Sequence, residues 1–192
     1  MWFALLIGTV GFGGMFATYS FITPTLTTLA GIPEAAMPWV LAAYGCGMVA
    51  GMVLAGRIAH LGIMRGIIVS LALIAAMLAT FGLVVGSPVL AVVWVVLLGV
   101  LPSILVPLLQ TRLMDVAHEG QALAATLNHS TLNIANALGA ALGSLVLARG
   151  LGYAAPSRVG ALLAVAGLGV AVLSSVVQRR SLGMGHWSDP AR

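Results

Sequence analysis

Apolar residues dominate this chain in six long runs, and short stretches with polar or turn-forming residues separate them. A helix needs about 20 mainly apolar residues to cross the hydrocarbon core of a bilayer. Six windows reach roughly that length: residues 2–22, 38–56, 66–85, 88–108, 122–148 and 159–178. The pattern predicts an all-α membrane protein in which residues 1–178 form a bundle of six transmembrane helices. Residues 179–192 are polar and are expected to form a cytoplasmic tail.

Composition supports a membrane protein. Of the 192 residues, 61% are hydrophobic and only 6% are charged, whereas about a quarter of the residues in a soluble domain are charged. The net charge of +4 comes entirely from arginines that lie between the hydrophobic runs. Arginines in such connections set the orientation of a membrane protein. We therefore expect the chain to lie in the lipid bilayer and to have no nucleic-acid partner.

The arginines also predict the orientation of the bundle. Six spans place both termini on one side of the membrane. The connections and tail on that side carry Arg57, Arg65, Arg112, Arg179, Arg180 and Arg192, and the opposite side carries Arg149 and Arg158. Basic residues are enriched on the cytoplasmic side. We therefore expect a multi-pass protein of the cell's inner membrane with both termini in the cytoplasm.

Residues 127–153, LNHSTLNIANALGAALGSLVLARGLGY, form the most polar of the long runs. Helical spacing puts His129, Asn133 and Asn136 on one face. An unpaired amide in hydrocarbon costs several kcal/mol, so this face is expected to turn toward a polar interior. Asn133 and Asn136 are candidates for a solute pathway, with hydrogen bonding between helices as the alternative. His129 could act as a pH switch or as a structural, hydrogen-bonded histidine.

The first run carries an aromatic stripe. Phe12, Phe16 and Tyr19 recur at i, i+4 and i+7 and so share one helical face. We take them as further candidates for the solute pathway, and ordinary packing is the alternative. Pro24 is expected to end or bend this helix. Pro102 and Pro107 are expected to bend the fourth helix, which occurs both in helices that line a transport cavity and in simple packing.

Small residues predict where helices approach one another closely. Gly47 and Gly51 are four residues apart in the second run, and Gly139 and Gly143 repeat the spacing in the fifth. Such pairs let two membrane helices pack at short distance. We assign all four glycines to helix packing.

The spans contain no carboxylate, and the histidines and serines show no catalytic or metal-binding pattern. The four carboxylates, at Glu34, Asp115, Glu119 and Asp189, all fall outside the apolar windows. The four histidines are scattered without the spacing of metal ligands, and no serine lies in a glycine-flanked nucleophile motif. We expect no enzymatic activity, no catalytic residue, no cofactor and no metal.

Four stretches of the sequence together resemble a known family. They are FATYSFITPTL (16–26), YGCGMVAGMVLAGRIAHLGIMRG (44–66), LLQTRLMD (108–115) and the polar run 127–153. In this order they are similar to the seventh and eighth helices, the end of the tenth and the eleventh helix of major facilitator superfamily transporters. Within that superfamily, the chain resembles the C-terminal six-helix half of drug:proton antiporters and of sugar or arabinose efflux carriers.

The second stretch resembles the family's basic loop motif, G-x-L-A-D-R-x-G-R-R. Gly56, Ala59 and Arg65 match the motif, and His60 stands where the acid usually sits. The resemblance implies that Gly56, Arg57 and Arg65 belong to a cytoplasmic gating loop. The charge interaction that the acid makes in gating is in doubt at this loop.

The resemblance implies a function as well. It implies an efflux-type secondary carrier that moves a small organic solute by alternating access, with proton coupling through a first half that this chain does not contain. The chain would then be a fragment, the product of a truncated gene, or a half that pairs with a second six-helix half in trans. The alternative is a non-transporting membrane subunit or scaffold that assembles through small-residue helix faces.

Overall fold

The computed structural model describes residues 2–117 and 120–184, which fold into helices and turns without any strand. Six helices are long and apolar enough to cross a membrane. The elements are α1 (Trp2–Tyr19), α2 (Ile22–Leu29), the 3-10 turn η1 (Glu34–Ala36), α3 (Met37–Ala59), α4 (Ile63–Val84), α5 (Pro88–Ala117), α6 (Gln121–Ala148) and α7 (Ala155–Met184). The predicted all-α fold with six membrane-spanning helices is confirmed.

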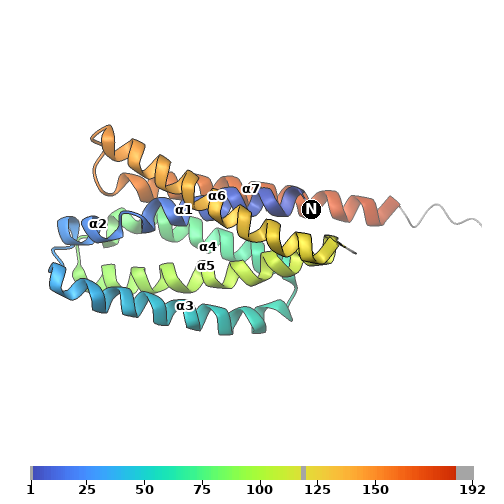
Figure 1. The fold of residues 1–192 in the computed structure, drawn as a ribbon, viewed down its shortest axis with the longest axis horizontal. Coiled ribbons are helices and arrows are strands. Elements are labelled where there is room, and N and C mark those ends of the chain that lie inside the picture. The colour runs from blue at the N-terminus through green and yellow to red at the C-terminus, as the bar shows by residue number, and fades with distance from the viewer. Residues whose placement is uncertain (1, 118–119, 185–192) are drawn as a thin grey trace, which may run out of the picture.

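The six long helices lie alongside one another along the length of the bundle (Figure 1). The N-terminus and the end of α7 lie at one end, together with the turn from α3 to α4, the end of α5 and the start of α6. Each helix overlaps one predicted apolar window, although α5 continues to Ala117 and α7 to Met184. The rest of the predicted tail, residues 185–192, lies outside the described residues.

The first helix ends before the proline that was expected to interrupt it. The break falls at Ser20 and Phe21, and Pro24 lies in the first turn of α2. A proline ring clashes with the carbonyl group four residues earlier, here that of Ser20. The first turn of a helix has no intrahelical acceptor for its N–H groups, so proline is tolerated there. The sequence between the first two spans therefore holds a short separate helix.

Helices α1 and α5 hold the bundle together. Helix α1 packs against α6 on one side and α7 on the other, while α5 packs against α3 and α4. Gly14 of α1 and Gly160 of α7 face each other so closely that neither has room for a methyl group. Most of the large buried side chains, among them Ile7, Leu71 and Leu105, form one apolar core, and Leu113 lies in a second, smaller cluster with Ala4 and Ala124.

Helices α3 and α6 are the least buried of the six spans. Helix α3 joins the bundle mainly through α5, and α6 joins mainly through α1. Their outward residues, such as Val49 and Met52 of α3 and Ile134 of α6, are exposed. The described bundle therefore leaves one face of each of these two helices uncovered.

Candidate functional site

A cavity of about 170 Å³ lies between four of the helices. Helix α1 lines it with Phe12, Met15 and Phe16, α3 with Tyr44 and Met48, α5 with Pro102, Ser103 and Val106, and α6 with Leu132. The lining contains no charged side chain, and its hydroxyl groups belong to Tyr44 and Ser103. The cavity is therefore suited to an apolar or weakly polar group.

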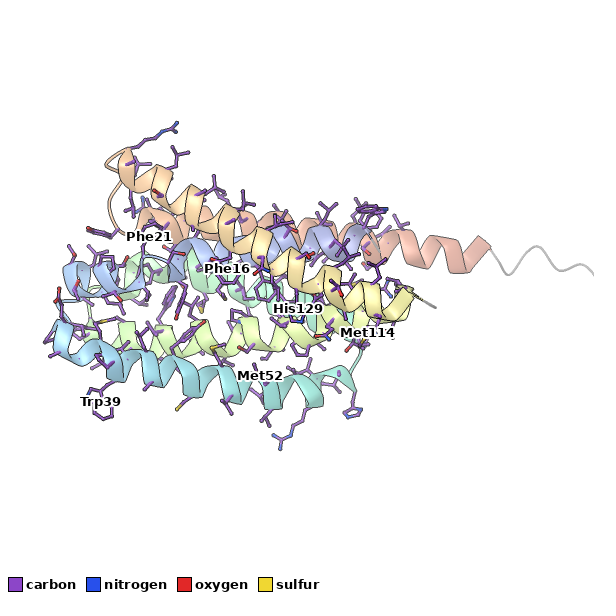
Figure 2. All side chains as sticks on the ribbon, in the orientation of Figure 1. Phe16, Phe21, Trp39, Met52, Met114 and His129 are labelled. Carbon is purple, nitrogen blue, oxygen red and sulfur yellow. The ribbon has the colours of Figure 1, made fainter. Side chains whose placement is uncertain are left out.

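Aromatic side chains form the wall of this cavity on the α1 side. Phe12 is almost completely buried, and Phe16 lies near the middle of the bundle (Figure 2). Tyr19, one turn further along, stacks on Tyr44 with the ring centroids 4.8 Å apart and the planes 27° apart. The structure thus brings two of the three predicted aromatic residues into one cavity and ties the third to its wall. Tyr44 was not predicted, although it shares the α3 face of Gly47 and Gly51.

Helix α5 closes the cavity with a proline and a serine. The helix runs unbroken through Pro102 and Pro107. Pro102 has no N–H to donate to the carbonyl group of Leu98, one turn earlier. Thr111 donates a hydrogen bond of 2.9 Å to the carbonyl oxygen of Pro107. Pro107 likewise has no N–H for the carbonyl group of Ser103, so this cavity-lining residue keeps a backbone acceptor without its usual helical donor.

The predicted amides of α6, unlike the aromatic residues, do not line the cavity. Asn133, Asn136 and His129 are exposed on the uncovered face of α6, and Leu132 is the α6 residue that lines the cavity. The amide that the bundle does bury is Asn128, which is 3% exposed. Its Nδ2 group has no hydrogen-bond partner within the described part of the chain. The face of Asn133 and Asn136 was expected to turn toward a polar interior, but the described bundle leaves it exposed, because helical periodicity does not show which neighbour a face meets.

The four predicted packing glycines lie at helix crossings. A methyl group on Gly47 would come 2.5 Å from the carbonyl oxygen of Val96, and one on Gly51 would strike the carbonyl oxygen of Val100. Both contacts join α3 to α5. Gly139 lies against the carbonyl oxygen of Gly13 in α1, and Gly143 lies against the carbonyl oxygen of Ala17 in α1 and the ring of Phe21 just after that helix. These crossings hold the helices that line the cavity at short distance.

Comparison of the sequence with known proteins identifies the family. No protein-family model matches the chain. An uncharacterised MFS-type transporter of Bacillus subtilis, YfhI, is 32% identical over 94% of this chain and 45% of its own length. The inner membrane transport protein YdhP of Escherichia coli K12 is 35% identical over 84% of the chain and 41% of its own length. The putative transporter AraJ of the same strain is 28% identical over 93% of the chain and 46% of its own length.

The chain belongs to the major facilitator superfamily. It spans about half the length of the curated relatives it matches. Six membrane-spanning helices are what half of a twelve-helix transporter contains, and the described helices supply that number. The resemblance read from the sequence is confirmed at the level of the superfamily.

The residues matched to the basic loop motif of this superfamily lie mainly in helices. Gly56 and Arg57 belong to the last turns of α3, and Arg65 belongs to the first turn of α4. The connection itself is the short turn 60–62, where Gly62 takes a positive φ of 115°. Arg57 and Arg65 are exposed and form no ion pair within residues 2–117 and 120–184. Both arginines stand at the end of the bundle that holds the N-terminus.

Proposed function

We propose that this chain is the C-terminal half of a secondary carrier that exports a small organic solute by alternating access. The solute would sit in the cavity between α1, α3, α5 and α6, against Phe12, Phe16 and Tyr19. A second six-helix half would cover the uncovered faces of α3 and α6. The observation that carries the proposal is this aromatic cavity, flanked by two exposed helix faces in a relative of transporters.

The exposed amides of α6 support a pathway beside the cavity. Asn133 and Asn136 lie on a face that would otherwise meet lipid. Polar side chains on membrane helices turn toward protein or water, because hydrocarbon offers them no hydrogen-bond partner. We therefore propose that this face borders the solute pathway at the junction with the second half. Gly56, Arg57 and Arg65 would form the cytoplasmic gate.

Coupling to protons requires the second half. Proton relays inside membranes use acidic or histidine side chains, and the described spans bury no carboxylate. Asp115 lies exposed near the end of α5, and Glu34 lies exposed in η1. We propose that a carboxylate in the partner half carries the proton, and that this half supplies the solute wall and part of the gate.

A transport assay tests the proposal. Cells lacking their own efflux carriers would express the complete reading frame that contains this chain, and retention of a panel of amphipathic dyes and labelled sugars would be measured. We expect faster efflux of at least one compound, and at least about a tenfold loss with Phe16→Ala or Asn136→Leu, since each removes a proposed solute contact. Leu162→Ala, on the exposed face of α7, is the matched control. Normal efflux by both Phe16→Ala and Asn136→Leu would overturn the proposed pathway.

The alternative is a scaffold that assembles through small-residue faces. The glycines expected to serve assembly, Gly47, Gly51, Gly139 and Gly143, are occupied by contacts inside the bundle, which favours the carrier. Asn136→Leu separates the two functions. Lost efflux with normal membrane insertion and normal pairing with the second half supports the carrier. Lost pairing, in a protein whose parent shows no efflux of any compound, supports the scaffold.

A further inference from the structure

A second and larger hollow lies at the end of the bundle far from the N-terminus. It has a volume of about 550 Å³, against about 170 Å³ for the central cavity. The chain after α2, the first turns of α3 and the first turns of α5 form its walls, with Ile32, Trp39, Val40, Val92 and Val93 among them. Every side chain in its lining is apolar.

The hollow lies where bulky side chains follow the glycines of the contact between α3 and α5. In the middle of the bundle, Gly47, Gly51 and Gly99 let the two backbones touch. Toward the start of α3, no further glycine continues the ladder, and Val40 and Val92 stand where glycines would be needed for equally close contact. Gly31, with φ of 66°, reverses the chain after α2 and sets its loop across the end of the gap. The result is an apolar groove between the two helices.

The groove opens away from the solute cavity. Trp39 lines the groove and Tyr44 lines the cavity. The two residues are five positions apart in α3, so their side chains leave the helix in directions about 140° apart. Trp39 is 79% exposed and points away from the neighbouring helices (Figure 2). Val89 beside it is also exposed. We take this face to meet lipid, whereas the proposed second half would cover the part of α3 that borders the solute cavity.

The charges around the groove favour a particular kind of lipid. Glu34 lies exposed between Pro33 and Ala36, which both line the groove. It is the carboxylate at this end, since Asp115, the other carboxylate in the described residues, lies near the opposite end of α5. The arginines at this end, Arg149 and Arg158, belong to the α6–α7 turn and to α7, on the other side of the bundle. An anionic headgroup therefore finds no basic partner in the groove lining.

We propose that the groove binds one acyl chain of a phospholipid with a primary-amine headgroup, such as phosphatidylethanolamine. The acyl chain lies between α3 and α5, and the headgroup ammonium pairs with the carboxylate of Glu34. Trp39 sits at the boundary of apolar and polar regions, where indole rings are enriched in membrane proteins. Apolar grooves of 300–1,000 Å³ with few polar groups are the usual form of ligand sites.

Fluorescence quenching tests the proposal. The protein has four tryptophans, and replacing Trp2, Trp94 and Trp187 with Phe leaves Trp39 as the reporter. Vesicles would contain brominated phosphatidylethanolamine or brominated phosphatidylglycerol at matched mole fractions. We expect brominated phosphatidylethanolamine to quench Trp39 about two- to fivefold more effectively than brominated phosphatidylglycerol, because one exposed ion pair contributes only a modest free energy. Glu34→Gln should abolish the difference.

Three outcomes would overturn the proposal. Equal quenching by both lipids, rising linearly with mole fraction, means ordinary bulk lipid. Stronger quenching by phosphatidylglycerol reverses the charge selectivity. No quenching by either lipid means that a protein segment covers the groove.

A second measurement avoids the replacement of Trp94, whose indole donates a hydrogen bond to the carbonyl oxygen of Met77. The otherwise unaltered protein would be released gently from detergent and weighed with its bound lipids by native mass spectrometry. Val92→Phe fills the groove and should remove the phosphatidylethanolamine adduct. Val69→Phe adds the same bulk on the exposed face of α4 and should leave the adduct unchanged. Equal retention by both variants would refute the site.

Discussion

At the scale of single residues, Asn128 is the least expected feature of the bundle. Its side chain is buried, and its Nδ2 group has no hydrogen-bond partner in the described residues. A buried polar group without a hydrogen bond destabilises a fold by about 1–3 kcal/mol. The residue therefore lowers the stability of the bundle, which the sequence pattern alone did not reveal.

We predict that Asn128→Leu raises the free energy of unfolding by about 1–3 kcal/mol, because leucine has a similar size and leaves no donor unsatisfied. Unfolding in detergent, followed by circular dichroism, measures the change. Asn136→Leu on the exposed face of the same helix is the control and should stay within about 0.5 kcal/mol. A clear loss of stability in Asn128→Leu would mean that the amide has a partner, such as a bound water.

The residues of the site were predicted to different degrees for a physical reason. The stripe of Phe12, Phe16 and Tyr19 was recognised from spacing, because residues four apart on a helix share a face. The spacing of Asn133 and Asn136 also showed that they share a helical face. Spacing does not show whether such a face contacts another helix, lipid or water. Tyr44, Met48 and Ser103 join the cavity through contacts between helices that lie far apart in sequence. Such contacts leave no periodic signal within one helix.

At the scale of helices, the crossing of α3 and α5 carries the clearest mechanical prediction. Gly51→Ala places a methyl group against the carbonyl oxygen of Val100 and the side chain of Ser103. Overpacking of this kind costs about 1–3 kcal/mol, so we expect a lower unfolding temperature. Separating the two helices should also disturb the cavity lined by Tyr44 and Ser103.

Gly45→Ala makes the same change one and a half turns away, where a methyl group meets nothing within 4 Å. Alanine favours a helix over glycine by about 1 kcal/mol, so this variant should be as stable as the parent protein or more stable. Thermal unfolding in detergent compares the two variants directly. Equal unfolding temperatures would show that the α3–α5 crossing adjusts to the extra group without cost.

The existence of the helices was more predictable than their burial. Six apolar windows became six helices, since every backbone group in a bilayer must bond within its own segment. Which helices lie inside could not be deduced from their apolar content, because lipid and protein core suit the same side chains. Helix α4 is strongly apolar and well buried, whereas α3 is also apolar and mostly exposed. Helix ends were shifted for local reasons, as at Ser20, where the clash with Pro24 stops α1 early.

At the scale of the whole molecule, two findings agree with each other. Helices α3 and α6 each have an uncovered face, and the chain matches only about half the length of its transporter relatives. A bundle built to stand alone in lipid would turn its amides inward, and α6 presents Asn133 and Asn136 outward. The cavity, moreover, is bordered by these two helices. The proposed second half, docked on them, would enclose the cavity and cover the amides in one step.

The orientation of the molecule is the last prediction, and it follows from charge alone. The N-terminus, the end of α7 and the α3–α4 turn lie at one end of the bundle (Figure 1), and the segments predicted for that side carry six of the eight arginines. Because basic residues resist transfer across the membrane, this end should face the cytoplasm. Alkaline phosphatase inserted after Gly150, in the α6–α7 turn, should be active, whereas phosphatase fused behind Arg192 should be inactive and a fluorescent protein there should be bright. The converse pattern would place Arg57 and Arg65 outside the cell, and the proposed cytoplasmic gate would fall with it.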